Sequence, residues 1–229
     1  MAVEVTAEHP RAANRRERYG LLLGAILGSF GMQGIAAPGR WQQIVITALL
    51  ATTLVLALWA ANARRSVMRA ALGVAVLLVV FSIVEAASGN VAGAGTRLAN
   101  LLLVVLAPPA VVVGVVRTLR ARGRVTVEAV LGVLCLYILL GMFFAFLYGS
   151  IDRLGQPFFS QDVQATVAKC LYYSFTTLTT VGYGDLTATT NLGHTLSVTE
   201  ALFGQIYLVT VVAVLVSNLS RPRRGNAAA

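Results

Sequence analysis

The stretch Thr179-Thr180-Val181-Gly182-Tyr183-Gly184-Asp185 stands among apolar segments of different lengths. Residues 166–178, directly before it, are too short to cross a bilayer, which takes about 20 residues of α-helix. Residues 125–148 and 195–219, further out on either side, are each long enough to cross. Glycines within the stretch can adopt backbone angles that other residues resist. This order predicts an outer helix, a short re-entrant helix and turn, and an inner helix, rather than a chance glycine-rich turn.

The residues from Leu171 to Asp185 (LYYSFTTLTTVGYGD) resemble the pore sequences of tetrameric potassium channels, including the two-pore-domain family. The likeness extends over residues 125–219. In that family the carbonyl oxygens of the TVGYG motif replace the hydration shell of the ion. The resemblance therefore implies a selectivity filter that binds K⁺ at Thr180, Val181, Gly182 and Tyr183 and is completed by Gly184. The carboxyl end of residues 166–178 would face the ion with a partial negative charge.

The resemblance also implies roles for residues around the filter. Support of the filter would come from Tyr172, Tyr173, Thr176, Thr179 and Asp185. The two tyrosines replace the paired tryptophans common in the family, and Thr176 stands where one well-known bacterial channel has a glutamate. The hydrogen bonds behind the filter should therefore differ from the family pattern. Gly204 follows the filter at the distance of the hinge glycine in bacterial potassium channels, which implies a gating hinge.

The composition is that of a membrane protein. Apolar residues make up 57% of the 229 residues and charged residues only 12%, and the mean hydropathy is +0.78. A soluble domain does not have this composition. The net charge of +9 comes from arginines in short clusters between apolar runs, so nucleic acid is not expected as a partner. The two cysteines lie in apolar stretches and form no metal-binding spacing, and no cofactor is expected.

Six spanning helices fit the apolar runs, at 19–37, 43–61, 69–88, 97–116, 125–148 and 195–219. Arginine clusters follow the second, fourth and sixth runs, whereas the alternate, outer loops hold only Arg40, Arg97, Arg153 and Lys169. This bias places both termini in the cytoplasm and the filter outside. The expected fold is an all-α, multi-pass protein of the cell membrane. Its parts are a cytoplasmic tail (1–18), a peripheral four-helix domain (19–124), a pore domain (125–220) and a short cytoplasmic C-terminus (221–229).

The peripheral domain lacks the charges of a voltage sensor. The fourth helix runs from Leu98 to Val116 without a charged residue and contains Pro108-Pro109, which should kink it. Voltage sensors resemble one another in carrying arginine at every third position there. In the first helix, glycines at four-residue spacing (Gly20, Gly24, Gly28) predict a groove for close helix packing. The arginines after the fourth helix are candidates for contact with anionic lipid (Arg117, Arg120, Arg122, Arg124), although the positive-inside orientation explains them equally well.

Three polar residues near the predicted helix ends have open roles. Glu85 is either a functional carboxylate of the membrane domain or a side chain that reaches water. His194 is either a pH sensor or a solvated loop residue. Glu200 either pairs with groups of the pore helix or favours the amino end of its own helix.

One filter segment cannot surround an ion, so four copies should meet on a common axis as a homotetramer. The expected function is passive, selective K⁺ conduction without strong voltage gating. A non-conducting membrane sensor with the same fold is the first alternative. An intramembrane enzyme is the second, but the histidines, His9 and His194, lie in a tail and a loop. The gating stimulus stays open between lipid, pH, tension, weak voltage and none.

Overall fold

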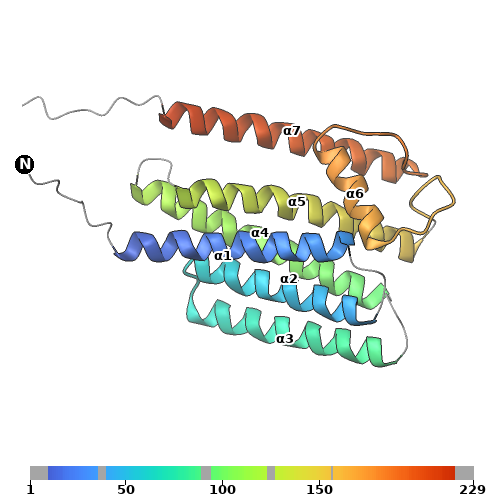
Figure 1. Cartoon of the computed structure of the whole chain (residues 1–229), viewed down its shortest axis with the longest axis horizontal. Coiled ribbons are helices and arrows are strands. Elements are labelled where there is room, and N and C mark those ends of the chain that lie inside the picture. Colours follow the sequence, from blue (N-terminus) through green and yellow to red (C-terminus); the bar gives the residue numbers. More distant parts are fainter. Residues whose placement is uncertain (1–9, 36–39, 89–93, 123–126, 156, 220–229) are drawn as a thin grey trace, which may run out of the picture.

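A computed structural model describes residues 10–35, 40–88, 94–122, 127–155 and 157–219. These residues form six long helices and one short helix (Figure 1). The elements are α1 (Pro10–Ile35), α2 (Arg40–Ala60), α3 (Arg65–Ala87), α4 (Ala94–Arg122), α5 (Val127–Leu154), α6 (Val167–Leu178) and α7 (Asn191–Leu219). Among the described residues, the one strand-like pairing is a single antiparallel bridge between Phe159 and Ala188.

Each predicted helix is present, with bounds that differ by a few residues at most ends. The largest difference is in α1, which begins at Pro10, inside the predicted tail of residues 1–18. α4 continues through Pro108 and Pro109. Within the described part of the chain, four helices are long and apolar enough to cross a membrane: α2, α3, α4 and α5. The chain is therefore a multi-pass membrane protein. For α1 and α7, the prediction that they also span the membrane rests on their lengths of 26 and 29 residues.

The six long helices run side by side, with α7 at one edge of the molecule and α3 at the opposite edge (Figure 1). Between them lie α5, α4, α1 and α2. Among the described elements, α3 contacts α2 and α4, whereas α7 contacts α5 and α6. α1 and α4 both pack on α5, whereas α2 and α3, in the residues described, contact only other peripheral helices, so the peripheral domain meets the pore segment of its own chain through α1 and α4.

Two glycines allow α1, α4 and α5 to approach closely around Tyr19, which is 1% exposed. A Cβ atom at Gly114 would lie 2.4 Å from the Tyr19 hydroxyl, and one at Gly132 would lie 2.4 Å from Val115 Cγ2. The predicted groove of α1 is not used in this way. Its glycines are exposed, and a Cβ atom added to any of them would meet nothing within 4 Å (Gly20, Gly24, Gly28). The prediction of close packing at that face is wrong within the chain, because α1 turns Tyr19, Leu22 and Ile26 toward the core instead.

Candidate functional site: the loop after α6 and its supports

The short helix α6 positions the loop that follows it. Thr166 caps its amino end by accepting a hydrogen bond from the Lys169 amide at 3.3 Å. The helix ends at Leu178, and Thr179 occupies the C-cap. In Figure 1, α6 lies obliquely across one end of α5 and α7. The carboxyl end of α6, with its partial negative charge, therefore leads directly into residues 180–184.

The backbone of residues 180–184 alternates in handedness. Thr180, Gly182 and Gly184 have φ angles of 59°, 49° and 79°, whereas Val181 and Tyr183 between them do not have positive φ. Alternation of this kind turns successive amides to one side of the chain and successive carbonyls to the other. The sequence explains Gly182 and Gly184, which tolerate positive φ. Thr180 was not expected in this region, because a β-branched residue rarely adopts it.

Hydrogen bonds to the carboxyl end of α6 hold the first part of this loop. The Thr176 carbonyl accepts from the amides of Val181 at 2.8 Å and Gly182 at 3.0 Å, and the Thr177 carbonyl accepts from the Thr180 amide at 2.9 Å. The amides thus face the helix, and the carbonyl groups between them face away from it. These three bonds stabilise the strained conformation of Thr180, which alone costs about 1–3 kcal/mol. Strain that is supported in this way is typical of functional loops.

Tyr172 braces the outer part of the loop. Its hydroxyl donates to Asp185 Oδ2 at 2.9 Å. Its ring stacks on that of Tyr183, with centroids 6.2 Å apart and an interplanar angle of 5°. The hydrogen bond to the carboxylate raises the pKa of the Tyr172 phenol, because a phenolate would face a second negative charge. Tyr172, Tyr183 and Asp185 therefore form one connected group at the end of the loop.

The other predicted supports lie at different places. Tyr173 points away from the loop, with its hydroxyl 2.7 Å from Ser197 Oγ and its ring among those of Tyr148, Phe158 and Phe159. These contacts anchor α6 to the neighbouring segments and do not reach residues 180–184. The hydroxyls of Thr176 and Thr179 donate to carbonyls of α6 itself. The contribution of Thr176 to the loop comes from its backbone carbonyl.

A short pairing fixes the chain on both sides of the loop. The Ser160 amide donates to the Thr187 carbonyl, and the Thr189 amide donates to the Phe158 carbonyl, both at 2.9 Å. His194, whose role the sequence left open, donates from Nε2 to the Ala188 carbonyl at 2.8 Å. His194 is thus tied to the same segment.

Glu200 connects three helices behind the loop. It is fully buried. Its Oε2 accepts from the Tyr148 hydroxyl of α5 at 2.6 Å, and its Oε1 contacts Ser174 Oγ of α6. Of the two roles that the sequence left open, pairing with the pore helix is the one observed. Sequence reasoning did not identify Tyr148 and Ser174, since nothing in their spacing separates them from ordinary helix residues.

The hydrogen count at Ser174 bears on the charge of Glu200. The Ser174 hydroxyl also lies 2.7 Å from the Gly141 carbonyl oxygen, which can only accept. A serine has a single hydroxyl hydrogen to donate. If it goes to Gly141, the hydrogen in the contact with Glu200 has to come from the carboxyl group. This geometry favours a protonated Glu200, and complete burial opposes the charged form as well.

The helix α7 contacts the end of α6 through Gly204 and the loop through Gln205. A Cβ atom at Gly204 would lie 2.1 Å from the Leu178 carbonyl oxygen, at the end of α6. The Gln205 amide donates from Nε2 to Thr180 Oγ1 at 3.2 Å, which leaves a lone pair of that hydroxyl oxygen free. Gly204 is therefore a packing position, whatever its role as a hinge. Sequence reasoning did not name Gln205, although an amide side chain within an apolar run could have drawn attention to it.

Arg97 ties the peripheral helices to the pore segment. It was expected in an outer loop, but it is only 6% exposed. Its Nη1 donates to the carbonyls of Gly149 and Ala165, both at 3.0 Å. These acceptors lie near the end of α5 and before α6, so Arg97 holds the two ends of the segment that leads to the short helix.

The remaining polar residues named from the sequence lie far from the loop. Glu85 is neither free nor fully solvated, because it accepts from the Thr96 hydroxyl across α3 and α4. Arg117 donates to the Ala61 carbonyl at 3.1 Å. Arg120 and Arg122 belong to the last turns of α4, where side chains are outside the described part, and Arg124 lies outside the described residues.

Comparison with known proteins agrees with this geometry. Residues 132–221 match a family model described as "Ion channel". This match covers most of α5, all of α6, the loop and α7. No curated protein and no solved structure matches the chain. The match supports ion-channel activity rather than enzymatic catalysis, in a chain that crosses the membrane several times.

Proposed function

We propose that this protein is a potassium-selective channel in which residues 180–184 form the filter. The observation that carries the proposal is the alternating backbone of Thr180, Gly182 and Gly184. Amides turned toward α6 leave carbonyl oxygens on the other side, where they can replace the hydration shell of a cation. The sequence of this loop, TVGYG, is that of potassium filters, and K⁺ would bind at the oxygens of Thr180, Val181, Gly182 and Tyr183.

A homotetramer is part of the proposal, because one loop provides oxygens on only one side of an ion. Exposed apolar surface beside the filter supports self-association. In the single chain Tyr183 is 71% exposed and Val181 53%. One side of α7 carries apolar residues that are each more than half exposed: Val198, Leu202, Ile206 and Val209. A hollow of about 470 Å³ beside α1 and α6 also borders Val181 and Tyr183. Neighbouring copies around a four-fold axis would cover these surfaces.

The proposed channel opens without strong dependence on voltage. One charge that crosses the whole membrane potential gains about 2.3 kcal/mol per 100 mV, and steep gating takes three or four such charges per subunit. α4 has no charged residue between Arg97 and Arg117. Both of these arginines are bonded to backbone carbonyls of neighbouring segments. We place the protein in the cell membrane, with both termini in the cytoplasm, as the arginine clusters favour.

The proposal is tested by ion flux into liposomes that contain the purified protein. We expect K⁺ flux to exceed Na⁺ flux strongly in wild type. A variant with Asp185→Asn provides a second reading, because it keeps the filter backbone and weakens the Tyr172 brace. Absence of any cation flux in well-inserted wild-type protein would favour the alternative of a non-conducting sensor. Equal K⁺ and Na⁺ flux would retain the channel but reject the potassium filter.

A further inference from the structure

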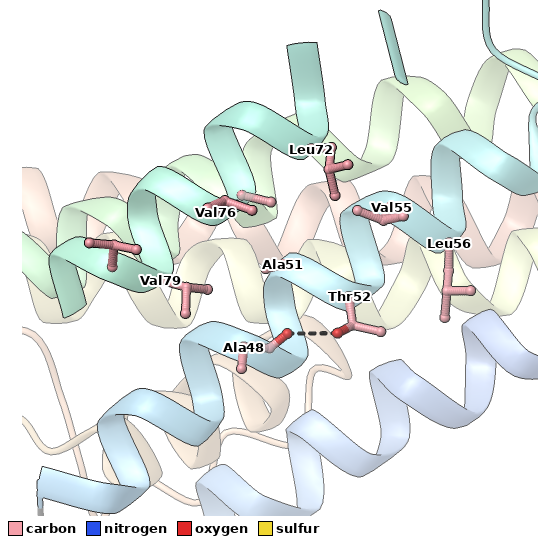
Figure 2. A pocket seen from close by; sticks show the side chains of 10 residues that line it. Ala48, Ala51, Thr52, Val55, Leu56, Leu72, Val76 and Val79 are labelled. Atoms are coloured by element: carbon pink, nitrogen blue, oxygen red, sulfur yellow. Dashed lines mark hydrogen bonds between the residues drawn. The ribbon is translucent and has the colours of Figure 1, made fainter. Parts of the chain in front are cut away.

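An apolar groove of about 460 Å³ lies between α2 and α3, far from the filter. Figure 2 shows its walls: Ala48, Thr52 and Val55 of α2 face Leu72, Val76 and Val79 of α3. The hydroxyl of Thr52 is satisfied within α2, because it donates to the Ala48 carbonyl at 2.8 Å. The walls therefore offer no free polar hydrogen from Thr52 and suit a hydrocarbon chain.

A second hollow, of about 540 Å³, lies at the turn between the same two helices. It is lined by Ala63, Arg65, Met68 and Arg69. Both arginines are exposed, so their guanidinium groups are available to an anion.

The hollow and the groove follow one another along one face of α3. Residues 65, 69, 72, 76 and 79 are spaced alternately by four and three, which places them in a single stripe on a helix. With a rise of 1.5 Å per residue, this stripe is about 21 Å long. Half the hydrocarbon thickness of a bilayer is about 15 Å. The stripe is thus long enough for a basic end at the membrane surface and an apolar part within one leaflet.

The surroundings of α3 indicate what covers this face. α3 lies at the edge of the molecule opposite α7 (Figure 1). If four copies meet at the filter, α3 faces outward, so the groove opens to lipid rather than to a neighbouring subunit. This step rests on the proposed function, whereas the charge and shape of the stripe do not.

We propose that the α2–α3 face binds one membrane phospholipid with an anionic headgroup. The headgroup lies at Arg65 and Arg69, and one acyl chain occupies the groove that runs from Leu72 to Val79. The anionic headgroup complements the positive charge of the hollow at Arg65 and Arg69, and the acyl chain complements the apolar walls of the groove. The site is distinct from the arginines after α4 that the sequence suggested as lipid contacts.

The chain offers a matched control for the headgroup. Arg64 precedes α3, is exposed and is adjacent to Arg65, but it does not line the hollow. Diffuse attraction to an anionic surface would weaken equally on replacing either arginine. A site with specific contacts to the headgroup would be weakened by replacing Arg65 but not by replacing Arg64. Each arginine near an anionic surface is worth about 1 kcal/mol, or about a fivefold change in affinity.

The experiment measures lipid binding directly, by native mass spectrometry of the purified full-length protein in detergent with added phosphatidylglycerol or phosphatidylcholine. We expect preferential retention of phosphatidylglycerol. Arg65→Gln and Arg69→Gln should each weaken it about fivefold, whereas Arg64→Gln should leave it nearly unchanged. Equal effects of the Arg64 and Arg65 substitutions, or equal retention of both lipids, would overturn the headgroup site.

A second pair of variants tests the groove. Ala48→Leu places a larger side chain in the groove and should weaken retention of phosphatidylglycerol. Ala70→Leu places the same side chain on α3 away from the stripe and should not. No difference between these two variants would overturn the placement of the acyl chain. Because binding is measured without ion flux, this outcome is independent of whether the pore selects K⁺.

Discussion

Replacing Gly204 by alanine separates two roles for this residue, a hinge in α7 and a close contact with α6. The hinge follows from the resemblance to bacterial potassium channels. The contact follows from the structure, where a Cβ atom would lie 2.1 Å from the Leu178 carbonyl oxygen. Atoms this close cannot coexist, so α7 and the end of α6 would have to separate by about 1 Å. The filter loop begins two residues after Leu178.

The size of the effect follows from opposing contributions. Overfilling a packed contact costs about 1–3 kcal/mol. Alanine in place of glycine within a helix returns up to about 1 kcal/mol. We therefore expect Gly204→Ala to destabilise each subunit by up to about 2 kcal/mol and to displace the inner end of the filter. Gly73→Ala is the matched control, since Gly73 lies inside α3 with nothing within 4 Å of the place that a Cβ atom would take.

Single-channel recording in lipid bilayers distinguishes the two roles, together with thermal unfolding of the purified protein. A packing role predicts a lower melting temperature and an altered unitary conductance or ion preference for Gly204→Ala. Gly73→Ala should be neutral or slightly stabilising. Unaltered conductance, ion preference and stability, combined with a lower open probability, would refute the packing argument and leave the hinge. Unaltered behaviour in every respect would refute both.

Four further predictions concern the filter, its supports and voltage. Gly182→Ala should abolish K⁺ current, because an L-residue at a φ of 49° costs about 1–2 kcal/mol in each copy. K⁺ currents of wild-type size in the substituted homotetramer would contradict this. Glu200→Gln should retain folding and flux, since an amide can accept from Tyr148 and donate to Ser174. Glu200→Ala should destabilise the protein by about 1–3 kcal/mol, because the buried Tyr148 hydroxyl loses its acceptor while Ser174 keeps the Gly141 carbonyl. Unfolding of the Gln variant would show that the charged form is needed. Thr187 lies two residues beyond Asp185, where the potassium channels that the sequence resembles sometimes have an aromatic ring that stacks external tetraethylammonium. External tetraethylammonium should block wild type weakly, because threonine provides no aromatic face, and Thr187→Tyr should strengthen the block. Strong wild-type block would show that this position is misassigned. The conductance–voltage curve in symmetric K⁺ should be shallow, and a steep curve that Arg117→Gln flattens would restore a voltage-gated assignment.

The helices and the order of the pore segment could be predicted because they depend on local pattern. Runs of apolar residues long enough to cross a membrane indicated six segments, and the short run before Thr179 marked α6. Helix ends were less certain, since α1 begins at Pro10 within a polar stretch where no change in hydropathy marks it.

The contacts between helices could not be predicted, because they depend on which faces meet. Regular spacing suggested a packing face at Gly20, Gly24 and Gly28, yet the close approaches around Tyr19 of α1 occur at single glycines of other helices, Gly114 and Gly132. The sequence also placed Arg97 in a loop, since charge usually indicates exposure. Its burial reflects two carbonyl acceptors that come from distant parts of the chain.

Within residues 180–184, the sequence motif predicts some of the backbone angles, whereas others depend on contacts that only the structure shows. The glycines at 182 and 184 have the positive φ angles that their residue type allows. The positive φ of Thr180 depends on the carbonyls of Thr176 and Thr177, so residue type alone gives no sign of it. The linkage of Glu200 to Ser174 likewise appears only when α6 and α7 are placed together.

The most direct test of the central claim is the reversal potential of wild-type channels in a planar bilayer, with K⁺ on one side and Na⁺ at equal concentration on the other. Backbone carbonyls that replace the hydration shell of K⁺ predict a reversal potential displaced strongly toward the K⁺ equilibrium potential. A reversal potential near zero, with measurable current from both ions, would contradict the assignment of residues 180–184 as a potassium filter.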